Sequence, residues 1–160
     1  YPDRVLAVVA VSAAPSFAGV SDADVLKHFS PGEPESETFV ERVMSWIGRG
    51  RKVAEDESDP LSYLVYHGGI VDKATLAARL HLMLTENLEP ILPEVAAPTL
   101  VVAGSEDWPR ILGGSQTIDL LVPDAVLEVL EGADHFCFYT RHDLFNSILD
   151  DFVSCEVPRL

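Results

Sequence analysis

Three short apolar runs stand out in the hydrophobic pattern of the chain, and each has the length of a β-strand. They cover residues 6–11 (LAVVAV), 98–103 (PTLVVA) and 126–131 (VLEVLE). The first two are apolar at consecutive positions, which is typical of parallel strands covered by helices on both faces. The third run carries two glutamates, so we expect it to lie at a more exposed edge of the sheet.

Apolar residues at helical spacing follow the second and third runs. Residues 114–122 predict a crossover helix, for which Ser115 is interpreted as an ordinary cap. Residues 144–153 predict a stronger helix, which Thr140 or Asp143 could cap. The resulting order is strand, helical insertion, strand, helix, strand, helix. This order predicts an α/β fold with a parallel sheet and right-handed crossovers.

The chain changes character between the first two runs. Acidic connectors at residues 31–35 and 55–60 separate helical patterns that begin near Ser36, Ser58 and Asp72. A helical block inserted between two strands of one sheet is typical of a lid or cap. The predicted division of the chain is a core strand at 1–15, a helical cap at 16–95 and a C-terminal core at 96–160.

Composition narrows the range of partners. The chain has 26 acidic and 11 basic residues, a net charge of -15, and 48% hydrophobic residues, enough for a core. A surface with this much negative charge repels nucleic acid and anionic membranes, so we expect neither as a partner. No apolar stretch approaches the roughly 18 residues of a spanning helix. Cys137 and Cys155 make no disulfide framework, which favours reduced thiols and a cytoplasmic location.

Two chemically capable residues follow the second and third runs, where sites form in open parallel sheets. Asp107 ends the segment Gly-Ser-Glu-Asp, and His135 ends the segment Gly-Ala-Asp-His. If the strands are neighbours, Asp107 and His135 face each other across adjacent loops. A carboxylate that accepts the Nδ1–H of a histidine fixes its tautomer and stabilises the imidazolium. The spacing alone also fits a helix-capping aspartate and a structural histidine.

Residues 93–153 closely resemble the C-terminal region of α/β-hydrolase-fold proteins. The family pattern there is a strand, Gly-x-x-Asp with the acid of a catalytic triad, a helix, a strand, Gly-x-x-His with the base, and a final helix. Residues 1–15 resemble the strand that follows the nucleophile helix, and residues 16–92 match the variable cap by position only. The resemblance implies that Asp107 is the triad acid and His135 the triad base.

The resemblance also implies that part of the fold lies outside this chain. The family order is nucleophile, acid, histidine, and no Gly-x-Ser-x-Gly occurs here, so we expect the nucleophile before Tyr1. We interpret Tyr1 as a cut or processed end. An N-terminal half of the same hydrolase, as a separate chain or a further segment, is expected to complete the partial parallel sheet. Without it, the chain alone is expected to be inactive.

The implied function is that of a serine-type hydrolase cleaving an ester-like bond in a small apolar substrate, with no metal or organic cofactor. The cap would select the substrate and exclude water. Two alternatives remain open. One is a lyase, an epoxide hydrolase or a dehalogenase on the same fold, and the other is a non-catalytic ligand-binding receptor.

Residues beside the two triad positions are weaker candidates. Trp108 and Phe136 could line an apolar substrate pocket, or could simply cover the core. Glu106 is an alternative to Asp107 as the acid, and Asp134 is expected to be a solvated loop residue. A metal could be bound by His135, Cys137 and His142. Their spacing matches no zinc pattern, so we do not expect a metal site there.

Overall fold

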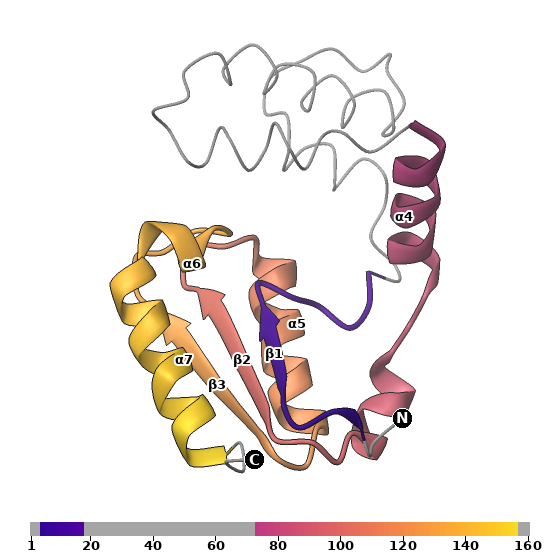
Figure 1. Cartoon of the computed structure of the whole chain (residues 1–160). Coiled ribbons are helices and arrows are strands. Elements are labelled where there is room, and N and C mark those ends of the chain that lie inside the picture. The colour runs from indigo at the N-terminus through magenta and orange to yellow at the C-terminus, as the bar shows by residue number, and fades with distance from the viewer. Residues whose placement is uncertain (1–3, 18–72, 157–160) are drawn as a thin grey trace. The chain divides into compact units, whose positions relative to one another are not determined.

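The computed structural model describes residues 4–17 and 73–156 (Figure 1). The helix predicted after Asp72 is present as α4 (Lys73–Thr85), whereas the helices predicted near Ser36 and Ser58 lie outside the described residues. The chain divides into two units, which comprise residues 1–17 with 87–160, and residues 18–86. The first of these units contains the sheet.

A three-stranded parallel sheet forms the centre of this unit, in the order β1-β2-β3. The strands are β1 (Val8–Val11), β2 (Thr99–Gly104) and β3 (Ala125–Leu130). Because all three run the same way, their carboxyl ends lie at one edge, where the arrowheads point in Figure 1. The predicted parallel sheet and the edge position of the third run are confirmed.

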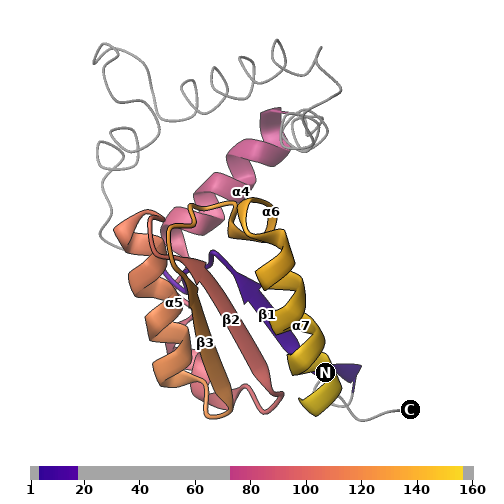
Figure 2. The ribbon, with the colours of Figure 1, turned by 90° about the vertical axis from the view of Figure 1, so that its left-hand side faces the viewer.

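Two helices cover the two faces of the sheet, α5 (Pro109–Leu121) on one side and α7 (His142–Glu156) on the other (Figure 2). All of β2 is buried, and its side chains alternate between the two layers. Leu100 and Val102 pack in the α7 layer, and Val101 packs with residues of α5. The α7 residues of the first layer are Phe145, Ile148, Leu149 and Phe152.

Helix α5 begins at Pro109, earlier than the predicted residue 114. Proline suits the first turn of a helix because it has no N–H and its φ is already helical. The interpretation of Ser115 as a cap is wrong. Ser115 lies inside α5, is fully buried, and donates a hydrogen bond from Oγ to the carbonyl of Ala13 at 2.9 Å. Position 114 requires a glycine, because a Cβ there would lie 2.3 Å from the Cβ of Ala14.

A one-turn helix, α6 (Cys137–Thr140), precedes α7 and was not predicted. The two proposed caps of the last helix are therefore wrong, since Thr140 ends α6 and Asp143 lies within the first turn of α7. Asp134 lies within hydrogen-bond distance of both ends of this extra turn. Its Oδ1 accepts hydrogen bonds from the N–H of Phe136 at 2.9 Å and from the hydroxyl of Thr140 at 3.5 Å.

The residues that flank the segment between Phe17 and Asn87 are hydrogen-bonded to each other. Ser16 and Asn87 form an antiparallel β-bridge, and the N–H of Leu88 donates to the carbonyl of Pro15 at 2.9 Å. The 3₁₀ helix η2 (Glu89–Glu94) follows and leads into β2. The chain thus leaves the sheet unit and returns to it at adjacent positions. None of the helices in the described ranges is long and apolar enough to cross a membrane.

Candidate active site

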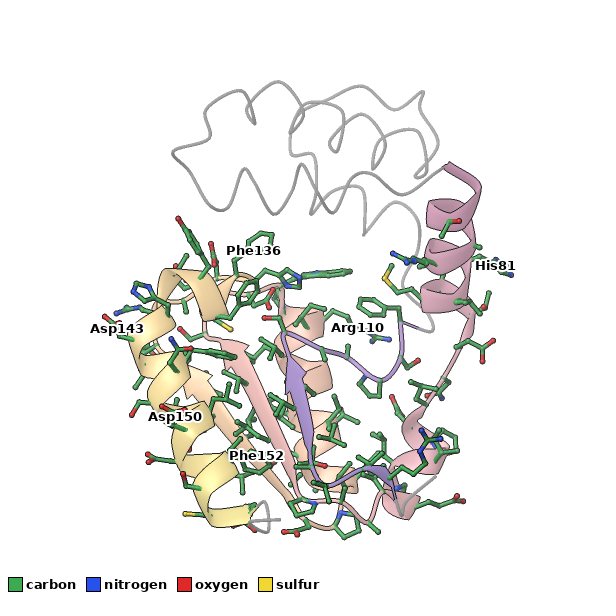
Figure 3. The ribbon with its side chains drawn as sticks, viewed as in Figure 1. His81, Arg110, Phe136, Asp143, Asp150 and Phe152 are labelled. Atoms are coloured by element: carbon green, nitrogen blue, oxygen red, sulfur yellow. The ribbon has the colours of Figure 1, made fainter. Side chains whose placement is uncertain are left out.

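The carboxyl ends of β2 and β3 bring Asp107 and His135 into contact. The Nδ1 atom of His135 lies 3.0 Å from Oδ2 and 3.1 Å from Oδ1 of Asp107. Figure 3 shows Phe136, the residue after His135, at the same end of the sheet. The two residues therefore meet at one rim, as the strand order requires, and their catalytic roles stay a prediction.

Burial differs sharply between the two partners. The Asp107 side chain is 2% exposed and the His135 side chain is 51% exposed. Asp107 Oδ1 also accepts the N–H of Trp108 at 2.6 Å, so the carboxylate is fixed by backbone as well as by the imidazole. A carboxylate on Nδ1 places the ring proton there, which leaves Nε2 of the neutral ring as an acceptor. The half-exposed imidazole can thus accept a proton at Nε2.

The acid loop and the histidine loop are bonded to each other directly. The N–H of Glu106 donates to the carbonyl of Ala133 at 2.9 Å, and the N–H of Gly132 donates to Oγ of Ser105 at 2.9 Å. Gly104 makes this closeness possible, because a Cβ there would lie 2.2 Å from the Ala133 carbonyl oxygen. Gly132 has a φ of 66°, the left-handed region that favours glycine.

Neighbouring acidic residues do not take the place of Asp107. Glu106 is exposed, and the carboxylate within hydrogen-bond distance of His135 Nδ1 is that of Asp107. Asp134 is exposed, as expected, and shapes the start of α6. Within the described ranges, no three His, Cys, Asp or Glu residues come together as a metal site.

Aromatic rings flank the pair on both loops. The ring of Phe136 meets the His135 imidazole edge to face, with centroids 5.5 Å apart. On the acid side, Trp108 packs on Phe17 with centroids 5.8 Å apart. Phe17 is buried and was not among the residues that the sequence singled out. Phe136 is thus the predicted substrate-lining residue that touches the histidine, whereas Trp108 contacts a core ring.

The end of β1 supplies a third contact, which sequence reasoning missed. Oγ of Ser12 donates to the backbone carbonyl of His135 at 2.8 Å and lies 3.7 Å from Sγ of Cys137. The sequence could have indicated Ser12 only by its position, as the first polar residue after the first apolar run. Cys137 and Cys155 are both free thiols, the former buried and the latter exposed.

Solved structures with a similar fold are α/β-hydrolase enzymes. An enol-lactonase from Burkholderia xenovorans is 18% identical with a TM-score of 0.69. A meta-cleavage product hydrolase from Pseudomonas fluorescens is 20% identical with a TM-score of 0.63. An esterase from Exiguobacterium antarcticum is 18% identical with a TM-score of 0.66. The chain therefore has the α/β-hydrolase fold.

The likeness covers nearly all of this chain and only part of the other proteins. It includes 96%, 96% and 94% of this chain, and 58%, 57% and 57% of the three structures, in the order given. The chain thus spans less than two thirds of their length, as the predicted partial fold requires. No protein-family model and no curated protein sequence matches the chain.

Proposed function

We propose that this chain supplies the acid and the base of a hydrolase that cleaves an ester-like bond in a small apolar molecule. The observation that carries the proposal is the contact between His135 Nδ1 and the buried carboxylate of Asp107. A lactonase, an esterase and a meta-cleavage product hydrolase are among the proteins with this fold, which supports hydrolysis, although a bromoperoxidase from Bacillus anthracis with a TM-score of 0.69 is among them too.

In the proposed mechanism, Nε2 of His135 takes the proton from a serine nucleophile and later gives it to the leaving group. Asp107 holds the ring orientation and stabilises the imidazolium that forms between these two steps. Phe136 would offer an apolar surface beside the reacting atoms, and Trp108 would extend that surface on the acid side. These steps use side chains and backbone only, and they need no metal or organic cofactor.

The nucleophile and the oxyanion-hole amides are proposed to come from an N-terminal half of the same hydrolase. The partial coverage of the similar structures supports this, since about two fifths of the enol-lactonase lies outside the likeness. We propose that this half pairs with β1 and that the small substrate binds between the two halves. A cytoplasmic location is proposed from the two free thiols.

The test uses the natural protein, including any segment that precedes Tyr1, and follows hydrolysis of p-nitrophenyl butyrate. His135→Ala should abolish turnover. Asp107→Asn should lower kcat by about 10,000-fold, because an amide stabilises the wrong tautomer and no longer balances the imidazolium charge.

The chain offers a matched control on its surface. His142 Nε2 lies 3.3 Å from Oδ1 of Asp143, and both side chains are largely exposed. His142→Ala and Asp143→Asn should therefore leave kcat unchanged. Full activity in His135→Ala would refute the proposed function. Ligand binding without turnover in the parent protein would favour the receptor alternative.

A further inference from the structure

Ser12 stands in an unusual backbone conformation at the end of β1. Its N–H still donates to the carbonyl of Val102 at 2.8 Å, so the ladder with β2 continues to this residue. Its φ is 46°, in the left-handed region, which is costly for residues other than glycine, asparagine and aspartate. Glycine would adopt this φ at no cost, so a serine here points to a use for the side chain.

The hydroxyl of Ser12 connects β1 with the histidine loop. Its single hydrogen is donated to the His135 carbonyl at 2.8 Å, so the 3.7 Å contact with Cys137 requires the thiol to donate to Oγ. Burial raises the pKa of the Cys137 thiol above its ordinary value of 9.0, which keeps the S–H proton at neutral pH. The hydrogen bonds therefore run in one direction, from Cys137 through Ser12 to His135.

This chain of bonds holds the part of His135 that Asp107 does not hold. Asp107 fixes the imidazole through Nδ1, but the ring is half exposed and sits on a loop. Ser12 fixes the peptide carbonyl of the same residue from a strand of the sheet. Two anchors, one on the ring and one on the backbone, define the direction in which Nε2 points.

We propose that Ser12 is a positioning residue for His135. By holding the His135 carbonyl, it keeps Nδ1 on the Asp107 carboxylate and Nε2 directed towards the nucleophile. The part of this inference that concerns Nε2 rests on the proposed function. The part that concerns Nδ1 depends only on the contacts among these three residues.

Three variants of the natural protein separate positioning from backbone strain. Ser12→Ala removes the hydroxyl and keeps the strained φ, whereas Ser12→Gly removes the hydroxyl and relieves the strain. Ser115→Ala is the matched control. Its hydroxyl likewise donates to a backbone carbonyl, that of Ala13 at 2.9 Å, next to Ser12 in the sequence; Ser115 is fully buried, whereas Ser12 is partly buried.

Two readouts are measured in each variant. The first is kcat and KM for p-nitrophenyl butyrate. The second is the proton NMR signal of His135 Nδ1–H, assigned by its loss in His135→Asn. Both Ser12 variants should lower kcat about tenfold with little change in KM, since small displacements of a catalytic group cost rate steeply. Both should also speed the exchange of the Nδ1 proton with water. Ser115→Ala should change neither readout.

Recovery of kcat in Ser12→Gly would overturn the inference, because relief of strain would then explain the serine effect. Equal losses in Ser115→Ala and Ser12→Ala would overturn it too. An unchanged Nδ1 proton signal in both Ser12 variants would contradict it without reference to turnover. Failure of the proposed function would look different, as the parent would not hydrolyse the ester while the NMR signal still responded to Ser12.

Discussion

Gly104 is the residue that lets the acid loop and the histidine loop approach each other. A Cβ at this position would lie 2.2 Å from the carbonyl oxygen of Ala133 and 2.4 Å from that of Asp134. Because backbone atoms cannot rotate away as a side chain can, Gly104→Ala should separate the two loops. We expect a loss of about 3 kcal/mol in the free energy of unfolding, together with most of the hydrolytic activity, measured by urea denaturation and by initial rates.

Gly132 provides the comparison within the same pair of loops. Its added Cβ would meet a terminal guanidinium nitrogen of Arg141 at 3.0 Å, which is the end of a flexible side chain. The remaining cost of Gly132→Ala is that of a positive φ, about 1 kcal/mol. Similar stabilities for the Gly104 and Gly132 variants would contradict the steric argument.

At this scale, the sequence predicts the contact between Asp107 and His135 because each lies in the loop that follows a parallel strand, and the carboxyl ends of neighbouring parallel strands meet. Ser12 could not be predicted in the same way. Its partner is the backbone carbonyl of a residue 123 positions away, and a carbonyl has no residue-type signature. The contact between Phe17 and Trp108 could not be predicted either, because Phe17 belongs to no periodic run of apolar residues.

Among the elements, α5 carries two adjacent glycines with opposite surroundings. A Cβ on Gly113 would meet nothing within 4 Å, whereas one on Gly114 would lie 2.6 Å from Cα of Ala14. Gly113→Ala should therefore raise the free energy of unfolding by about 0.5 kcal/mol, since alanine favours the helix. Gly114→Ala should lower it by about 2 kcal/mol, since it pushes the helix from the β1 loop.

The midpoints of urea unfolding measure this pair of variants, and each serves as the control for the other. If both substitutions stabilise the protein, α5 does not pack closely on Ala14, in the loop after β1. Two destabilising ones would show that Gly113 also needs its freedom of conformation.

The same glycines explain why elements were only partly predictable. Apolar runs predicted the three strands of the described residues, and a stripe of apolar residues predicted α7, because burial sets the period of both patterns. Gly113 and Gly114 reduce helix propensity, so the first turns of α5 were not expected; packing on Ala14 overrides that propensity. Helix α6 is a single turn of four residues, which is too short to leave a periodic pattern.

At the scale of the whole molecule, the outer edge of β1 determines whether residues 1–160 fold when they are expressed without a partner. In the described part of the chain, β1 pairs with β2 only, and Val9 is 40% exposed. An apolar strand with one free edge promotes association. Residues 1–160 expressed alone should therefore aggregate or remain molten, with dye binding, no near-ultraviolet circular dichroism and no sharp thermal transition.

Co-expression with the proposed N-terminal half should restore a cooperative transition and a defined particle size. The net charge of -15 opposes aggregation, so the dichroism and the melting curve are the decisive measurements. A monomeric chain of 160 residues that melts sharply by itself would contradict this prediction.

The bridge between Ser16 and Asn87 bears on how such a protein can diversify. Because this bridge joins the residues that flank segment 18–86, a longer or shorter segment in its place need only connect the same two points. Doubling the length of a flexible loop adds only about 0.6 kcal/mol to the entropy of closure. The segment of residues 18–86 could therefore be exchanged at this junction, while Asp107 and His135 keep their contact beyond the ends of β2 and β3.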